Sequence, residues 1–192
     1  MNGGTYDLHV HTDASPCSGA SPTAMVKAAV KAGLDGIAVT DHDTLANVAA
    51  VRAAAPTGLD VVPGVEVTTE TGHLLALGVD RAPPRTDPCT VVADVHDQGG
   101  VAVPSHPFDT LRQHYSTGCE ELASVVDGVE TVNSRCLRRR FNARAEAFAR
   151  DHDLAVTGGS DAHFPMEVGR AYTVVDGDLL TARRETWLPP RH

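Results

Sequence analysis

Short apolar runs alternate along the chain with longer segments in which apolar residues recur at helical spacing. The first pattern predicts buried strands and the second predicts amphipathic helices. The predicted strands cover residues 6–10, 36–40, 60–67, 73–78, 101–103, 125–131, 155–157 and 171–175. The predicted helices cover residues 22–32, 44–55, 87–98 and 138–152. The first helix has the clearest ends, because Ser21 suits the N-cap, Pro22 the first turn and Gly33 the stop.

Strands that alternate with helices predict a mainly parallel sheet joined by helical crossovers. About seven strands in a chain of 192 residues favour a small, distorted barrel, and an open doubly wound sheet is the alternative. The chain has no internal repeat. We therefore expect a single domain over residues 1–192, in which residues 176–192 form a peripheral C-terminal tail.

Potential metal ligands lie at the ends of the predicted strands, one strand after another. His9 and His11 stand two apart on the first strand, so their side chains are expected to share one face, with Leu8 and Val10 on the other. Later strands end or begin at His42, Glu66, His73, His106, Asp161 and His163. Sites in parallel α/β folds form at the carboxyl ends of strands, so we expect these side chains to meet in one pocket.

This mixture of ligands predicts a particular class of cofactor. Imidazoles together with carboxylates suit Zn, Mn or Fe rather than Ca. The number of ligands exceeds what one ion needs, and Glu66 or Asp161 can bridge, so two to three divalent ions are expected. The remaining histidines are interpreted as ordinary surface or core residues: His96, His114, His152 and His192.

Composition narrows the classes of function. The net charge of −9 argues against a general binder of long nucleic acid, which needs a basic face, but allows a nucleotide or short oligonucleotide. No apolar run approaches the ~20 residues of a membrane span, and no secretory signal pattern is present, so no membrane association and a cytoplasmic location are expected. The four cysteines form no CxxC pair and are expected to be free thiols. Oligomeric state is not predicted.

Five motifs in a fixed order resemble the PHP (polymerase and histidinol phosphatase) family. They are His-Val-His at 9–11, Thr-Asp-His-Asp at 40–43, Gly-Val-Glu at 64–66, Ser-His-Pro at 105–107 and Gly-Ser-Asp-Ala-His at 159–163. The resemblance implies a distorted (βα)7 TIM-like barrel with three metal ions and phosphoesterase activity. It implies that the first ion is held by His9, His11, Glu66 and Asp161, the second by His42 and His163, and the third by Glu66, His73 and His106.

The chain departs from the family's pattern after the first motif. Members often place a further His or Asp there, near the second ion, whereas this chain has Cys17, six residues after His11. A thiolate at this position favours Zn. Asp13 is the competing ligand, and a position completed by water, with Cys17 as a buried apolar side chain, is the third interpretation.

The predicted reaction is hydrolysis of a phosphomonoester, or of a phosphodiester in a nucleotide or short oligonucleotide, by a metal-activated water. Asp41 is expected to accept the proton or to orient a ligand, and Arg135 to clamp the phosphate. Asp43 is either the N-cap of the helix at 44–55 or a similar orienting residue. The alternatives are a zinc amidohydrolase of C–N bonds, which usually needs a metal-bridging lysine, and a non-catalytic metal-binding module.

Overall fold

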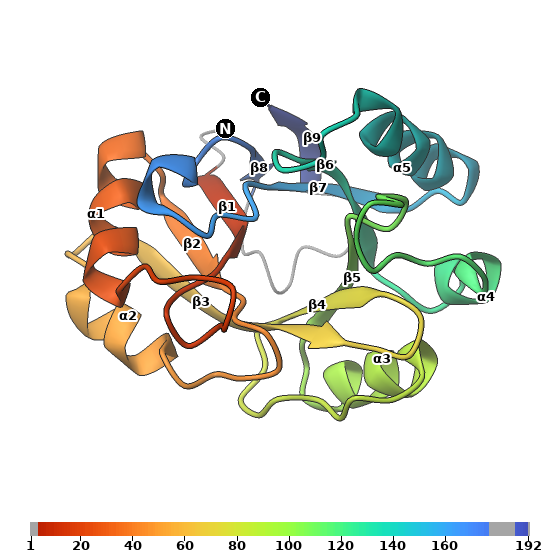
Figure 1. Ribbon diagram of the computed structural model, residues 1–192, viewed down its shortest axis with the longest axis horizontal. Coiled ribbons are helices and arrows are strands. Elements are labelled where there is room, and N and C mark those ends of the chain that lie inside the picture. Colours follow the sequence, from red (N-terminus) through yellow and green to blue (C-terminus); the bar gives the residue numbers. More distant parts are fainter. Residues whose placement is uncertain (1–3, 177–186, 192) are drawn as a thin grey trace.

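The computed structural model describes residues 4–176 and 187–191 of the chain, and Figure 1 shows strands in the middle with helices around them. The elements begin with β1 (Gly4–Val10), α1 (Pro22–Ala32), β2 (Gly36–Val39), α2 (Val48–Ala54) and β3 (Asp60–Thr68). They continue with β4 (His73–Leu77), α3 (Pro88–Asp97), β5 (Val101–Ser105), α4 (Cys119–Ala123), β6 (Gly128–Asn133) and α5 (Arg139–Asp151). The last are β7 (Ala155–Gly159), the 3-10 turn η1 (Pro165–Glu167), β8 (Tyr172–Val175) and β9 (Trp187–Arg191).

The strands form a curled arrangement that resembles part of a barrel. Seven of them make one sheet in the order β5-β4-β3-β2-β1-β8-β9, and β6 and β7 make a separate parallel pair. In space β6 lies beside β5, and β7 lies beside β1 and β9, so the pair sits between the two ends of the sheet. The fold is a mixed α/β single domain, consistent with a TIM-like architecture.

The sheet is mixed rather than mainly parallel. β1, β2 and β3 are parallel neighbours, but β4 runs antiparallel to both β3 and β5, and β8 runs antiparallel to β1 and β9. Residues 69–72 join β3 to β4, and so short a connection permits only an antiparallel pair, since a parallel crossover needs about a dozen residues. A helix therefore does not follow every strand.

The helix ends show which local signals decide the structure. The side chain of Ser21 accepts a hydrogen bond from the backbone N–H of Ala24, and Gly33 ends α1 with a φ of 73°, which confirms the predicted limits. α2 begins later than predicted, at Val48. Asp43 is not its N-cap, because its carboxylate instead accepts a hydrogen bond from the backbone N–H of Thr68 at 2.7 Å. No helix in the described part of the chain is both long and apolar enough to cross a bilayer.

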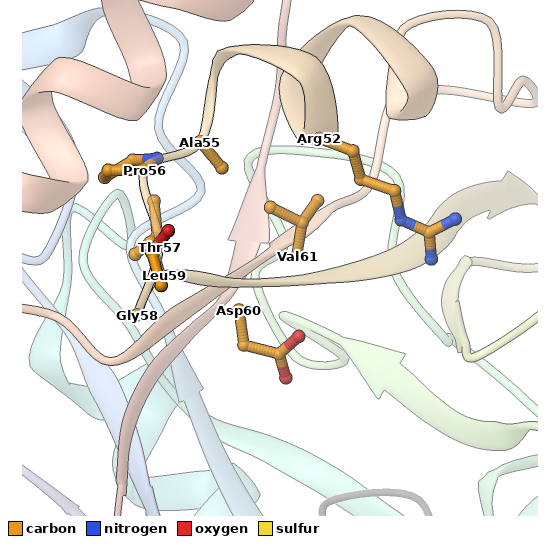
Figure 2. A pocket seen from close by; sticks show the side chains of 8 residues that line it. All are labelled: Arg52, Ala55, Pro56, Thr57, Gly58, Leu59, Asp60 and Val61. Carbon is orange, nitrogen blue, oxygen red and sulfur yellow. The ribbon is translucent and has the colours of Figure 1, made fainter.

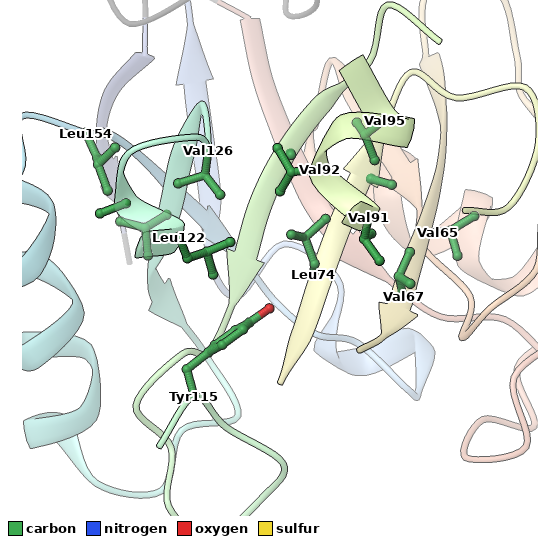
Figure 3. Packing of buried hydrophobic residues seen from close by; sticks show 14 of the residues in the cluster. Val65, Val67, Leu74, Val91, Val92, Val95, Tyr115, Leu122, Val126 and Leu154 are labelled. Carbon is green, nitrogen blue, oxygen red and sulfur yellow. The ribbon is translucent and has the colours of Figure 1, made fainter. Parts of the chain in front are cut away.

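Apolar clusters hold the helices against the strands. Val91, Val92 and Val95 of α3 pack against Val67 and Leu74 of β3 and β4 (Figure 3). A second cluster joins α1 and α2 to β1, β2 and β3, and a third lies among the strands themselves. These clusters fix the strand positions, and the polar ends of the strands are carried on that frame.

The first strand does not follow simple alternation. Its pairing with β2 shifts register between Asp7 and Val10. As a result Leu8 packs in the cluster among the strands, whereas Val10 packs under the first two helices. The predicted sharing of one face by these two residues is therefore wrong, although His9 and His11 do reach the same site.

The C-terminal part of the chain contributes to the sheet. Trp187–Arg191 forms β9, which pairs antiparallel with β8. Residues 177–186 and 192 of the predicted peripheral tail lie outside the described residues. Within the part that is described, the tail includes an edge strand of the main sheet.

Candidate metal centre

The side chains predicted from the strand ends come together at one edge of the sheet. They are His9, His11, His42, Glu66, His73, His106, Asp161 and His163. β4 is the informative case, because it runs against its neighbours. Its first residue, His73, pairs with Ser105 at the end of β5, so it reaches the same edge as the ends of the parallel strands.

Glu66 lies at the centre of the cluster and is fully buried. Its Oε2 atom is 3.3 Å from Nε2 of His9, 3.2 Å from Nε2 of His11 and 3.3 Å from Nδ1 of His42. Three imidazoles from two strand ends thus converge on one oxygen of this carboxylate.

The other oxygen of Glu66 faces a different group. Oε1 is 3.1 Å from Nε2 of His106 and 3.5 Å from Nδ1 of His73, and it accepts a hydrogen bond from Oγ of Ser105 at 2.8 Å. The carboxylate therefore stands between two sets of imidazoles. This is the arrangement that a bridging ligand of two cations requires.

Asp161 provides the second central carboxylate. Its Oδ1 atom is 3.4 Å from Nε2 of His11, 3.6 Å from Nε2 of His9 and 3.4 Å from Nδ1 of His163. Asp161 and His106 both have positive φ angles, 55° and 32°, which non-glycine residues adopt rarely. Such strain is concentrated at functional sites, and here it aims two strand-end side chains into the cluster.

Buried imidazole nitrogens that make no hydrogen bond indicate whether the site suits cations. Nε2 of His9 and His11 and Nδ1 of His73 and His106 are buried and make no hydrogen bond, although carboxylate oxygens lie 3.2–3.6 Å from the first three. Within the described residues no other buried side-chain nitrogen or oxygen lacks a hydrogen bond. A buried polar atom left unpaired costs about 1–3 kcal/mol, so four in one place call for a binding partner. Imidazole and carboxylate together suit Zn, Mn or Fe. The residues present therefore fit divalent cations.

The described residues contain three groups of potential ligand atoms, and within each group the atoms lie no more than 4.8 Å apart. They are His9 with His11 and Asp161, Glu66 with His73 and His106, and His11 with Cys17 and His42. The first two groups lie on the two sides of Glu66 described above. Three groups of potential ligands are thus present in the described residues, and the number of ions stays a prediction.

Burial and neighbouring charges move the pKa values of these groups. Burial raises the pKa of Glu66, but the imidazoles around it, His9 first, hold that pKa well below its ordinary value. Burial lowers the pKa of His9, but Asp161, Glu66 and Glu130 outweigh burial and raise it well above the usual range. Burial lowers the pKa of His73 to about 4. An ionised Glu66 and a neutral His73 are the forms that bind cations.

Glu130 of β6 is a buried carboxylate that the sequence analysis missed. Its Oε1 lies 2.9 Å from Nδ1 of His9, and its Oε2 accepts hydrogen bonds from the backbone N–H of His106 at 2.7 Å and from Nδ2 of Asn133 at 2.9 Å. A carboxylate on Nδ1 fixes the ring and leaves Nε2 free for a cation. Gly159 is needed beside it, because a Cβ there would stand 2.4 Å from Cβ of His9.

Replacement of Glu130 by glutamine is expected to weaken metal binding by about 10–100-fold, the usual effect of losing a carboxylate behind a ligand histidine. The amide keeps the shape of the side chain but removes the charge that holds His9. Competition with a chelating dye measures the affinity. Glu146→Gln, on the exposed face of α5, is the matched control. Equal affinity in the two variants would show that Glu130 does not act on the site.

Asp41 lies behind the cluster. Its carboxylate accepts hydrogen bonds from the backbone N–H and the hydroxyl of Thr12 at 2.7 and 2.6 Å, and from Oγ of Ser15 at 2.6 Å. Oγ of Ser15 lies in turn 3.2 Å from Nδ1 of His11. Of the two roles predicted for Asp41, this geometry favours orientation of a ligand over direct acceptance of a proton.

Arg135, the predicted phosphate clamp, lies at the rim of the site. Its Nη1 is 3.0 Å from both carboxylate oxygens of Glu167 in η1. The same carboxylate accepts a hydrogen bond from the backbone N–H of His163 at 2.9 Å. Arg135, Arg112 and Arg170 line one cavity of about 390 Å³. The cavity adjoins the metal cluster through Arg112, and the carboxylates of Asp109 and Glu167 line it as well.

Arg112 is the arginine that reaches the cluster. It lies in the irregular segment between β5 and α4, and it is not among the residues predicted from the sequence. Its Nη1 contacts Oδ2 of Asp161, and its Nε lies 2.9 Å from Oδ2 of Asp109. Burial lowers the pKa of Arg112, but Asp161 outweighs burial and raises it, so the guanidinium stays charged.

Cys17 and Asp13, the two competing ligands of the sequence analysis, are placed differently. The carboxylate of Asp13 accepts a hydrogen bond from Nδ2 of Asn47 at 2.6 Å, whereas Cys17 lies beside His11 and His42. Burial raises the pKa of the Cys17 thiol, but a hydrogen bond with His42 and the charges of both histidines place it below its usual value. All four cysteines are free, as predicted.

A second hollow shows that not every cavity belongs to the site. It measures about 410 Å³ and lies around Pro56 and Asp60, where β3 begins (Figure 2). Glu66 is six residues further along the same strand, roughly 20 Å away at the rise of an extended chain. None of the three ligand groups found in the described residues lines this hollow.

Comparison with known sequences gives one family model and several relatives. The model, described as PHP-associated, matches residues 139–183. Two uncharacterized proteins of Methanocaldococcus jannaschii are 32% and 30% identical, over 86% and 67% of this chain and over 68% and 81% of their own lengths. The 5'-3' exoribonuclease Rnm of Escherichia coli is 38% identical over 87 residues, which are 41% of this chain and 29% of that enzyme.

Solved structures share the fold over nearly the whole chain. PsfC of Pseudomonas syringae matches with a TM-score of 0.77 and 22% identity, covering 98% of this chain and 92% of PsfC. A Bifidobacterium adolescentis protein to which metal-dependent phosphoesterase activity is ascribed matches with a TM-score of 0.72 and 22% identity, covering 84% and 88%. An amidohydrolase of Chromobacterium violaceum matches with a TM-score of 0.72 and 18% identity, covering 94% and 93%.

Proposed function

The chain belongs to the PHP (polymerase and histidinol phosphatase) family, and on that premise we propose that it hydrolyses a phosphate ester of a nucleotide or short oligonucleotide with two to three divalent cations. The observation that carries the proposal is the placement of Glu66, whose two oxygens face separate sets of imidazoles. The similarity of part of the chain to a 5'-3' exoribonuclease supports the substrate class. We interpret the curled sheet as a TIM-like barrel that has lost the regular βα repeat.

The residues that would hold the cations are those that the family resemblance implies, and the ligand groups of the structure support the first two sets. His9, His11, Glu66 and Asp161 would hold the first, Glu66, His73 and His106 another, and His42 and His163 a further one. Cations so placed supply Lewis-acid activation of water and neutralisation of phosphate charge. Zn, Mn and Fe are the ions that this donor set favours.

The side chains around the cluster supply binding and orientation. Arg112 presents a guanidinium beside Asp161, and it would donate to the non-bridging oxygens of a phosphate by exchanging its contact with Asp161 or Asn133. Arg135 would reach the same phosphate only after leaving Glu167. Glu130 and Asp41 hold His9 and His11 from behind, so the cluster is set before substrate arrives.

Hydrolysis of C–N bonds is the weaker alternative. An amidohydrolase shares the fold, but at 18% identity. The metal-bridging lysine usual in such enzymes has no counterpart at the cluster. Both lysines of the chain, Lys27 and Lys31, lie on α1 and line a separate hollow with Met166. A purely structural metal site would not need a charged arginine at its mouth.

An assay with several metals and several bonds tests the proposal. The protein is loaded in turn with Mn²⁺, Zn²⁺ and Co²⁺ and given p-nitrophenyl phosphate, bis-p-nitrophenyl phosphate, a short 5'-phosphorylated oligoribonucleotide and p-nitroacetanilide. We expect cleavage of phosphate esters and not of the anilide. Protein that demonstrably holds metal yet cleaves no phosphate ester would rule the proposal out.

A further inference from the structure

The loop after β1 presents Cys17 to the metal cluster in a fixed position. Backbone bonds from Ser15 to Thr12 and from Ser18 to Ser15, at 2.9 and 3.1 Å, form two successive turns. The hydroxyl of Ser18 donates to the backbone carbonyl of His163 at 2.8 Å. The loop is thereby attached to the end of β7, and the thiol is held at the mouth of the site.

The ligand environment next to Cys17 is incomplete without a cation. Sγ of Cys17 and ring nitrogens of His11 and His42 lie within 4.8 Å of one another. Nε2 of His11 is fully buried and makes no hydrogen bond, although oxygens of Glu66 and Asp161 lie 3.2 and 3.4 Å away. A cysteine beside an unpaired, buried imidazole nitrogen is a ligand set rather than an isolated thiol.

Oxygen ligands do not replace the thiol at this position. Asp13 is engaged with Asn47, and Asp41 with Thr12 and Ser15. The carboxylates of the cluster itself, Glu66 and Asp161, serve the other two groups. Within the described residues, Glu66, whose Oε2 lies 3.3 Å from Nδ1 of His42, and Cys17 are thus the two groups on the His42 side that can carry a negative charge, and only Cys17 offers sulfur.

We propose that Cys17 and His42 together hold one ion of the cluster, and that the thiolate makes this position selective for zinc and other thiolate-binding ions. The inference rests on the metal cluster of the proposed function. It adds that the ion positions in this cluster differ in the metals they prefer. The two groups on either side of Glu66 offer only nitrogen and oxygen, which suit Mn as well as Zn. The Cys17 position disfavours Mn, so the cluster would hold unlike ions.

The exposed thiol of Cys17 should react differently with and without a bound ion. Cys17 is exposed, so reagents in solvent reach it when no ion is bound. A bound ion would engage the sulfur and block alkylation. Cys89 at the start of α3 is exposed as well but belongs to none of the ligand groups, and it serves as the internal control.

Cobalt titration of the metal-free protein tests the inference, because a thiolate bound to Co²⁺ gives a charge-transfer band in the near ultraviolet. We expect the band in the wild type and in Cys89→Ser, and its loss in Cys17→Ser and Cys17→Asp. Zinc affinity at this position should fall by about 100-fold or more in Cys17→Ser, since removing a direct ligand costs at least as much as removing its support. Cys17→Asp should bind Mn²⁺ more tightly than the wild type.

Two results would overturn the inference. One is a wild-type protein that holds cobalt by elemental analysis and shows no sulfur band, and the other is a band unchanged in Cys17→Ser. Alkylation by iodoacetamide gives an independent measure, with zinc expected to protect Cys17 and leave Cys89 reactive. A sulfur band in a protein that cleaves no phosphate ester would refute the proposed reaction and leave this ligand assignment standing.

Discussion

Replacing Glu66 with glutamine is expected to reduce hydrolysis of phosphate esters by about a thousandfold or more, because bridged cations supply several kcal/mol of transition-state stabilisation. The amide keeps the size of the side chain but loses the charge on which two sets of imidazoles converge. Steady-state rates with the best metal measure the effect. Metal content should fall in parallel, since the change removes a ligand from two positions.

Glu70→Gln is the matched control, because Glu70 is exposed in the turn that follows β3. It should keep the wild-type rate and metal content. Circular dichroism separates loss of metal from loss of fold, as the apolar clusters do not include Glu66. A Glu66→Gln protein that is folded, retains its metal and remains fully active would refute the bridging role.

Arg112→Ala is expected to lower the rate by about 100–1,000-fold, the usual effect of removing one donor aimed at a developing negative charge. Arg112→Lys should recover little of this loss, because an ammonium group lacks the planar fork that pairs with phosphate oxygens. Separate values of kcat and KM are informative here. A lower kcat together with a higher KM would indicate that Arg112 contacts the phosphate in the ground state and in the transition state.

Arg135→Ala is the comparison for Arg112. Its guanidinium is engaged with Glu167 at the rim, so we expect a rate change of less than about tenfold, close to the cost of a partly exposed ion pair. Metal content should stay constant in both variants. A larger loss for Arg135 than for Arg112 would reverse the assignment and restore the clamp predicted from the sequence.

The sequence predicts the place of the site well because strand ends carry a simple signal. His9 and His11 follow the first apolar run, and Asp161 and His163 follow a later one. In the structure these side chains meet. The prediction needs only the order of strands and their polar ends. The antiparallel direction of β4 does not disturb it, since His73 begins that strand rather than ending it.

The residues that support the site are harder to predict, because their partners are distant in sequence. Glu130 is separated from His9 by 121 residues, and Arg112 from Asp161 by 49. Glu130 does carry a signal, because a charged residue inside an apolar strand indicates a buried carboxylate that needs a partner. No comparable signal marks Arg112, which lies in an irregular loop. The position of Arg135 after β6 favours the role of a phosphate clamp. Its pairing with Glu167 is a tertiary contact, which the sequence does not reveal.

Anomalous diffraction from crystals of the protein soaked with Mn²⁺ or Zn²⁺ is the most direct test of whether Glu66 bridges two cations, because it locates each ion relative to this carboxylate. We expect at least two peaks, one beside Oε1 with His73 and His106, and one beside Oε2 with His9 and His11. A single peak bound by one oxygen, or peaks away from Glu66, would contradict it.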